Sequence, residues 1–288
     1  MAHAKPTIQL ILNLYKRGYF ANFKSVIEIG SQDLNFQPRT NLFELIRGEL
    51  SLDTNYLEHV FSEALRKSTP DDFSPDWLFK LLGFQEYYCV DADGRHDAFI
   101  WDLNVPIPVD QRGRYDLITN NGTSEHVFNI SQIFKNIHDL AHAGSIMLHM
   151  LPFQGYIDHG FYNYQPSFFE DMAYENRYEI IEKFVIISKA EDAAESAQII
   201  PYSKDTFVDI YKRDKDSDAL LYYALRKQNN KDFRIPFQGI YDPLLLTNYR
   251  KSFSQKLSQK IAIFFFKGPN SFGRRIQKSV KEMLHLSE

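Results

Sequence analysis

The sequence predicts an α/β fold, in which helices cover a doubly wound sheet of seven strands that is mostly parallel, with the last pair antiparallel. Short apolar runs alternate with helical patterns along the chain, which is typical of parallel sheets. Polar residues follow several of these runs directly, where ligands bind in open α/β sheets. The 288 residues, 44% of them hydrophobic, suffice for a sizeable core.

Apolar runs predict the strands, and a spacing of three to four residues predicts the helices. The first apolar segment, IQLILNLY, is interrupted by Gln9 and Asn13 and lacks a small-residue cleavage site, so it predicts a helix rather than a signal peptide. Further helices are expected at 55–67, 75–82, 130–141 and 166–177. Strands are expected at 25–29, 86–90, 98–101, 115–119, 144–150, 180–188 and 219–226.

The predicted main domain spans residues 1–228 and carries a helical insertion at about 37–84. Such an insertion is either a lid over the ligand side or a plain helical elaboration. A linker or edge segment at 229–249 and a basic, amphipathic helical tail at 250–288 follow. The tail has nine Lys/Arg and two Asp/Glu, whereas residues 1–249 carry a net charge of −11. Contact with an anionic membrane surface, an oligomer contact and packing on the body all suit this tail.

Composition argues against several classes of protein. No stretch approaches ~18 uninterrupted apolar residues, so no membrane span is expected. The acidic body lacks a basic stripe, which argues against nucleic acid as a partner. The single cysteine, Cys89, cannot form an internal disulfide and favours a reducing, cytoplasmic location, with peripheral membrane contact as the alternative for the tail. The oligomeric state is left open.

The segment SVIEIGSQDLNF raises the question of a cofactor loop. A strand at 25–29 runs into Gly30, which allows a sharp turn and a close approach to a ligand. A dinucleotide fingerprint needs further glycines, but Gln32 and Leu34 stand in their places. This disfavours NAD or FAD and leaves room for a cofactor without a pyrophosphate. A strand that simply meets a turn explains the same residues.

Two further segments place polar groups at strand ends. In EYYCVDADGRHDAFIWDLN, Asp91 follows a strand and can accept hydrogen bonds from ribose hydroxyls, and Asp102 can accept one from an adenine amino group. Asp93-Gly94 is also ordinary turn chemistry. In YDLITNNGTSEHVFN, a strand delivers a polar run that ends in His126. A ligand or a helix N-terminus capped by Thr123 would satisfy that run.

Taken together, these segments resemble the class I S-adenosylmethionine-dependent methyltransferases, over roughly residues 25–227. IEIGSQD is similar to their first motif, YCVDAD to the ribose-binding strand end, WDLN to the adenine motif and YDLITNNGTSEHV to the fourth-strand motif. The resemblance implies a Rossmann-like fold, S-adenosyl-L-methionine as cofactor, and methyl transfer. The cofactor-binding residues that it implies are Glu28, Gly30, Ser31, Asp91, Asp102, Leu103 and Asn120.

The acceptor side is expected among the histidines and aromatic residues after the fourth and fifth expected strands. A neutral imidazole can remove the proton of a hydroxyl acceptor, and His159 is the first candidate, followed by His126 and His149. His138 and His142 in HDLAH lack the glutamate of the zincin pattern, so no metal is expected.

The segment LPFQGYIDHGFYNYQPSFFEDM combines aromatic rings with amides, which suits a small-molecule or sugar hydroxyl as the acceptor. Two alternatives remain, an N-methyltransferase of a small molecule and an inactive methyltransferase-like binding or scaffold protein. An NAD-linked oxidoreductase is the least expected function, because the glycines that hold a pyrophosphate are missing.

Overall fold

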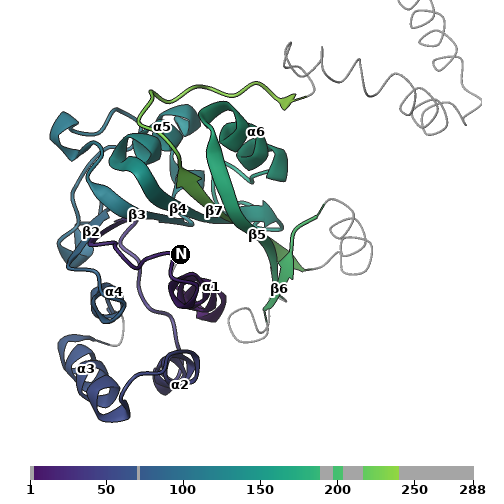
Figure 1. The fold of residues 1–288 in the computed structure, drawn as a ribbon. Helices are drawn as coiled ribbons and strands as arrows, with labels where there is room; N and C mark the ends of the chain where they lie inside the picture. The colour runs from purple at the N-terminus through teal and green to yellow at the C-terminus, as the bar shows by residue number, and fades with distance from the viewer. Residues whose placement is uncertain (1–2, 70–71, 189–196, 204–216, 240–288) are drawn as a thin grey trace, which may run out of the picture. The chain divides into compact units, whose positions relative to one another are not determined.

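The computed structural model describes residues 3–69, 72–188, 197–203 and 217–239 (Figure 1). The chain divides into two compact units, Met1–Pro236 and Phe237–Glu288. The expected basic tail at 250–288 and the second half of the expected linker lie outside the described residues. No helix in the described ranges is both long enough and apolar enough to cross a membrane.

A seven-stranded mixed sheet forms the centre of the first unit, in the order β2-β1-β3-β4-β7-β5-β6 (Figure 1). Pairing is parallel from β2 through β1 and β3 to β4, whereas β7 is antiparallel to β4 and to β5, and β6 is antiparallel to β5. The predicted fold class is therefore confirmed. The strands are Ser25–Ile29 (β1), Glu86–Val90 (β2), Tyr115–Asn121 (β3), Ala141–Gln154 (β4), Tyr178–Ser188 (β5), Gln198–Pro201 (β6) and Asp218–Lys227 (β7).

Helices cover both faces of the sheet (Figure 1). On one face lie α1 (Lys5–Lys16), α2 (Thr40–Glu49), α3 (Thr54–Lys67) and α4 (Asp76–Leu81). On the other face lie α5 (Ile130–Leu140) and α6 (Pro166–Asn176). Short 3₁₀ turns follow strand ends or lie in loops: η1 (Arg95–Asp97), η2 (Val109–Gln111) and η3 (Ser124–His126). The expected insertion thus forms α2, α3 and α4.

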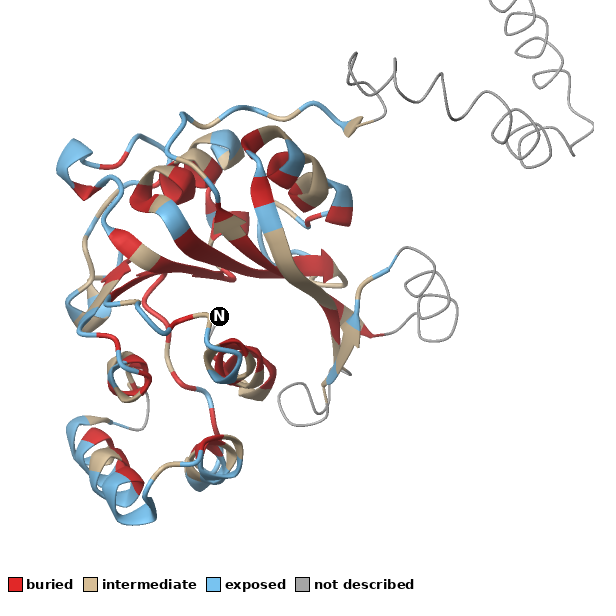
Figure 2. Cartoon of the chain, viewed as in Figure 1, coloured by how far each residue is buried: buried red, intermediate tan, exposed pale blue. Residues whose placement is uncertain are grey.

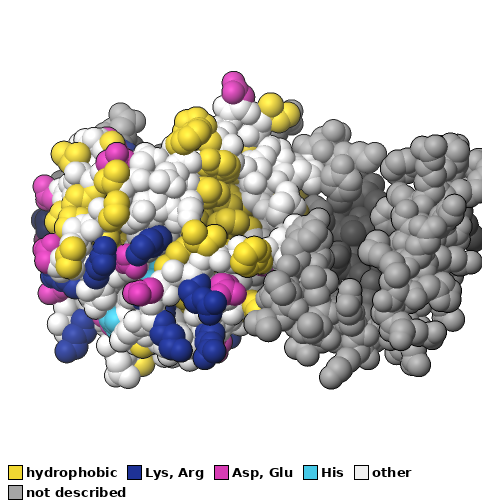
Figure 3. Space-filling model, turned by 90° about the horizontal axis from the view of Figure 1, so that it is seen from above, with side chains coloured by type: hydrophobic (Ala, Val, Ile, Leu, Met, Phe, Trp, Pro, Cys, Tyr) yellow, Lys and Arg dark blue, Asp and Glu magenta, His cyan; other side chains and the backbone are white. Residues whose placement is uncertain are grey.

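The core consists of two apolar clusters, one on each face of the sheet, and buried residues line the sheet from β1 to β7 (Figure 2). All five residues of β1 are buried; Val26 faces the α1 side, and Ile27 and Ile29 face the α5 side. Burial on both faces explains why its apolar residues Val26, Ile27 and Ile29 do not alternate strictly with polar ones. Seen from above, apolar side chains form a band, and charges of both signs are interspersed (Figure 3).

The structure differs from the expected elements at the two edges of the sheet. Residues 98–101 form no strand; Phe99 makes an isolated bridge to Val90, and its ring stacks on that of Trp101 at 4.7 Å. The seventh strand is instead β6, which the sequence analysis missed because four residues are too short for a periodic signal. Helix α2 was also missed.

The segment after β7 continues along the first unit, where Arg234 pairs with Glu175 of α6 at 2.8 Å.

Candidate active site

The turns after β1 and β3 meet at the position where strand order reverses. Gly30 has φ +101°, and its N–H donates to Val90 O at 2.8 Å. A Cβ atom at this position would lie 2.3 Å from Thr123 Oγ1 and 2.6 Å from the Gln32 side chain. Thr123 Oγ1 cannot easily move, because it donates to Ile29 O at 2.7 Å. Glycine is therefore required both by the backbone angle and by the close approach of the two turns.

A dense hydrogen-bonded network joins this turn to the end of β2. Ser31 donates from its backbone N–H to Asp91 Oδ2 at 2.9 Å, and its hydroxyl lies 2.9 Å from Asp93 Oδ1. Arg95 donates to Asp93 at 2.7 Å and to Asp33 at 2.6 Å. Burial acts to raise the pKa of Asp93. The hydrogen bonds from Arg95 outweigh this effect and hold that pKa below its usual value.

Asp91 keeps capacity for a ligand within this network. Its Oδ2 accepts from both polar groups of Ser31, and its Oδ1 accepts from the backbone N–H of Asp93 at 3.2 Å. A carboxylate has about four acceptor positions. One position therefore remains for a hydroxyl group, at the carboxyl end of β2 where a ribose is expected.

Glu28 lies in a different environment from the one expected. It is fully buried, and it bonds to His3 Nε2 at 2.5 Å, Tyr87 OH at 2.7 Å and Thr119 Oγ1 at 3.1 Å. These groups come from the N-terminal segment, β2 and β3. The structure thus places Glu28 among protein groups, where it fastens the N-terminal segment to the sheet, rather than at a ligand-facing surface.

Asn120 is likewise engaged by the protein. Its amide donates to Ser124 Oγ at 3.0 Å, and its carbonyl accepts from Ser124 N–H at 3.2 Å. The same amide nitrogen lies 3.3 Å from His149 Nδ1. This arrangement shapes the turn between β3 and η3, so Asn120 orients the residues that follow it.

The expected adenine motif forms a loop on the α5 side. Asp102 is exposed and accepts from Asn104 N–H and from its side-chain amide, both at 2.9 Å. Leu103 is buried in the core, and its carbonyl accepts from Asn136 Nδ2 at 3.1 Å. Asn136 lies fully buried on α5 and also donates to Val105 O at 2.9 Å. The sequence analysis missed Asn136. An amide between Ile133 and Ile137, on the apolar face of the expected helix, was a signal for a buried hydrogen-bonding group.

Two of the candidate histidines come together beside a buried glutamate. His126 Nε2 lies 3.9 Å from Glu125 Oε1, and His159 Nε2 lies 3.8 Å from the same atom. The two imidazole rings are 4.9 Å apart between centroids and meet edge to face. Neighbouring parallel strands explain the meeting, because η3 follows β3 and the loop with His159 follows β4.

Two hydrogen bonds hold the loop after β4 against η3 and the residues that follow it. Phe161 N–H donates to Glu125 O at 2.8 Å, and Tyr162 OH donates to Phe128 O at 2.6 Å. A Cβ on Gly160 would lie 3.1 Å from Glu125 Cγ and 3.2 Å from His126 Nδ1. A glycine at 160 therefore lets the loop approach the cluster closely.

Glu125 has no hydrogen-bond partner for either carboxylate oxygen, although it is fully buried. Burial raises its pKa to about 7, against a smaller opposing effect of its own backbone N–H. Burial and the neighbouring His159 lower the pKa of His126. The sequence analysis included Glu125 only as part of the polar run that ends in His126.

The other histidines that the sequence analysis singled out lie apart from this cluster. His149 is buried against Phe134 and Phe169, and burial lowers its pKa to about 3. His138 contacts Tyr178 OH at 2.5 Å, whereas His142 contacts Asp116 Oδ1 at 3.1 Å. Helix α5 ends at Leu140, so the two histidines of HDLAH do not share a helix face.

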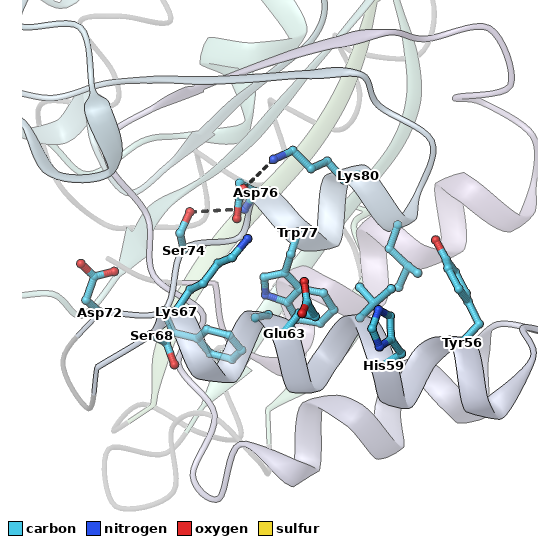
Figure 4. A pocket seen from close by; sticks show the side chains of 14 residues that line it. Tyr56, His59, Glu63, Lys67, Ser68, Asp72, Ser74, Asp76, Trp77 and Lys80 are labelled. Atoms are coloured by element: carbon cyan, nitrogen blue, oxygen red, sulfur yellow. Dashed lines mark hydrogen bonds and ion pairs between the residues drawn. The ribbon is translucent and has the colours of Figure 1, made fainter.

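A groove of about 290 Å³ lies between α3 and α4 (Figure 4). Side chains of α3, including His59 and Glu63, line it together with Trp77 and Lys80 of α4. Lys80 pairs with Asp76 at 2.9 Å. None of its lining residues belongs to the turns after β1, β3 or β4, so the groove is separate from the candidate active site.

No protein-family model and no curated protein sequence matches the chain. Among solved structures, similar ones include TehB from Haemophilus influenzae, with 11% identity over 75% of this chain and a TM-score of 0.39; this chain covers 61% of TehB. A SAM-dependent methyltransferase from Archaeoglobus fulgidus has 13% identity and a TM-score of 0.37, with 75% of this chain and 93% of that one covered.

An O-methyltransferase from a Brevibacillus brevis polyketide multienzyme, in complex with S-adenosyl-L-homocysteine, has 13% identity and a TM-score of 0.38, with 91% of this chain and 86% of that one covered. At these values the three likenesses carry no conclusion about activity, and the fold assignment rests on the sheet. Four parallel strands in the order β2-β1-β3-β4 are followed by β7, antiparallel between β4 and β5. By that strand order and direction, the chain has the fold of the class I S-adenosylmethionine-dependent methyltransferases.

Proposed function

We propose that the protein transfers a methyl group from S-adenosyl-L-methionine to a hydroxyl of a small molecule or sugar. The observation that carries the proposal is the contact between the turns after β1 and β3, over the point where strand order reverses. There, Gly30 leaves no room for a side chain, and Asp91 stands at the end of the neighbouring strand. Open α/β sheets bind nucleotide-like ligands at such points.

The residues present fit this donor better than a dinucleotide. Gly30 and Ser31 supply a turn with one glycine, which suffices where no pyrophosphate has to approach the backbone. Asp91 retains an acceptor position for a ribose hydroxyl, and Asp102 is exposed on the loop expected at the adenine. We assign Glu28 and Asn120 an indirect part, because their polar atoms bond to protein groups.

We place the acceptor beside Glu125, His126 and His159. When bound, the donor supplies an activated methyl group, so alignment of the acceptor accounts for much of the rate. Phe128 and Phe161 are both exposed, and their rings meet edge to face at 5.5 Å next to this cluster. They offer an apolar wall for the acceptor, and the cluster is where its hydroxyl loses a proton. His149 has no contact with an acceptor in this scheme, because it is buried.

Calorimetry with S-adenosyl-L-methionine and S-adenosylhomocysteine tests the cofactor site. We expect saturable binding to the full chain and a loss of about tenfold or more in Asp91→Asn, since a hydrogen bond to a charged group contributes about 1.5–3 kcal/mol. Gly30→Ala is expected to lose binding because its Cβ would displace Thr123. Asp110→Asn, at an exposed loop position, serves as the control and should bind as the wild type does. Absence of heat at millimolar ligand with folded protein would reject the proposal.

Incubation with labelled methyl donor and host extract tests the reaction. A labelled methyl ether is the expected product, and a labelled amine would favour the N-methyltransferase alternative. Binding without any labelled product, across extracts, would instead support a binding or scaffold protein.

A further inference from the structure

The cluster of Glu125, His126 and His159 contains a buried carboxyl group that has no partner within the fold. Glu125 is fully buried, and neither of its carboxylate oxygens accepts a hydrogen bond. Among the residues that the structure describes, the other fully buried glutamate, Glu28, has three side-chain partners. An ionised carboxylate without a partner costs several kcal/mol in a protein interior. A positively charged ligand would remove this cost by stabilising the ionised form.

The two imidazoles do not serve as that partner in the observed geometry. Their Nε2 atoms lie 3.8 and 3.9 Å from Glu125 Oε1, too far for hydrogen bonds. The three potential ligand atoms all lie within 4.8 Å of one another. Atoms bound to one cation at about 2.0–2.2 Å are about 3–4 Å apart, depending on the bond angle. The spacing is therefore too wide for direct contact and close to what an ion between the groups requires.

We propose that Glu125, His126 and His159 form a site for a divalent transition-metal ion. Two imidazoles and one carboxylate are the donors that zinc and iron(II) commonly use when coordination positions stay open. Both histidines are partly exposed, at 44% and 35% of their side-chain areas, whereas the carboxylate is buried behind them. The open positions would thus face the solvent side, where the acceptor is placed.

The surrounding backbone favours this site. The 3₁₀ turn η3 carries Glu125 and His126, and the loop after β4 brings His159 to them. The hydrogen bond from Phe161 N–H to Glu125 O and the close approach at Gly160 join the two segments.

A bound ion would also define how the acceptor is activated, a consequence that rests on the proposed function. A hydroxyl coordinated at an open position becomes more acidic, and its proton leaves to solvent water. Its oxygen then forms a bond to the methyl carbon as the bond from that carbon to sulfur breaks. The imidazoles would act as ligands in this scheme, and no free histidine base is needed.

The binding step is tested without donor or acceptor. The tag-free full chain is stripped with EDTA, dialysed, and titrated with Zn²⁺ by calorimetry and with Co²⁺ by absorption spectroscopy. We expect one saturable site and a Co²⁺ spectrum typical of nitrogen and oxygen ligands. Glu125→Gln and His159→Ala should each weaken binding tenfold or more, and His59→Ala, an exposed histidine of α3, should leave it unchanged.

Several results would overturn the inference. No saturable binding to the wild-type chain would do so, as would binding that Glu125→Gln and His159→Ala leave intact. If Glu125→Gln does not fold, His126→Ala gives the same test from a partly exposed position. Because donor binding is measured separately, metal binding without donor binding would reject the proposed function alone, and the reverse result would reject the metal site alone.

Discussion

Two fully buried glutamates, Glu28 in β1 and Glu125 in η3, differ in nearly every contact they make. Glu28 bonds to an imidazole, a phenol and a hydroxyl from three separate elements. The carboxylate of Glu125 has no hydrogen-bond partner and faces two histidines just beyond hydrogen-bond distance. A buried carboxylate with a structural role is paired within the fold, whereas an unpaired buried carboxyl group with a shifted pKa is typical of a functional site.

The paired glutamate has a structural consequence at the N-terminus. His3 Nε2 bonds to Glu28, and its backbone N–H donates to Asp33 O at 2.8 Å. Asn35 N–H returns a bond to His3 O at 2.9 Å. The chain before α1 is thereby joined to the loop after β1, next to the Gly30 turn. Removal of Glu28 should therefore disturb two segments that are far apart in sequence.

The largest expected effect is that of Glu28→Ala. Removing one partner of a buried ionic network typically costs about 3–5 kcal/mol, because the remaining polar groups stay buried without partners. We expect a loss of this size in the free energy of unfolding, measured with urea at pH 7. Glu44→Ala, in an exposed pair with Arg47 on α2, should cost less than about 1 kcal/mol. Equal costs for the two variants would contradict the contrast between paired core charge and surface charge.

His138 tests whether hydrogen bonds within the fold also hold a buried group in its neutral form. It donates from Nε2 to Lys231 O at 2.8 Å, so Nδ1 accepts from Tyr178 OH at 2.5 Å. Burial and, next, the charge of Lys227 lower its pKa to about 4 from 6.5. Between these values the unfolded chain binds a proton that the folded chain does not, so stability falls as the pH falls through this window.

The expected loss attributable to His138 is about 3 kcal/mol between pH 7 and pH 4, at about 1.4 kcal/mol for each pKa unit. Unfolding free energies of wild type and His138→Gln, measured at several pH values, give the comparison. The variant should show a shallower acid slope, although His149, whose pKa burial lowers to about 3, keeps part of it. Parallel slopes for the two proteins would show that His138 does not titrate in this way.

The sequence predicted the features that follow directly from the geometry of turns and of neighbouring parallel strands. A buried strand followed by one glycine predicts a sharp turn, and Gly30 indeed has a positive φ. The meeting of His126 and His159 follows from adjacency of β3 and β4, since carboxyl ends of parallel neighbours lie at one edge. The order of the strands was accessible from the motif order that the chain shares with a family of known fold.

Long-range partners were not accessible in the same way. Glu28 was assigned to the cofactor because nothing near it in sequence shows that His3, 25 residues earlier, bonds to it. Glu125 was passed over because its lack of partners is a property of the folded chain alone. At the sheet edge, residues 98–101 have the composition of a strand, but only Phe99 pairs with β2.

The smallest expected effect on stability is that of Glu125→Gln in metal-free protein. Because the carboxyl group has no hydrogen bond to lose and burial already raises its pKa to about 7, replacing it with a neutral amide of similar shape should change the free energy of unfolding by no more than about 1 kcal/mol. Urea unfolding in EDTA measures this change. A loss above about 2 kcal/mol would mean that Glu125 has a partner within the fold and belongs with Glu28.

Adding Zn²⁺ to the same pair of proteins sharpens the contrast. A ligand that binds the folded state stabilises it in proportion to the logarithm of its concentration above the dissociation constant. Wild type should therefore gain stability with Zn²⁺, and Glu125→Gln should gain less at every concentration. Glu28→Ala should keep the same zinc-dependent increment on its lower baseline, because the network around Glu28 and the cluster around Glu125 have no side chain in common.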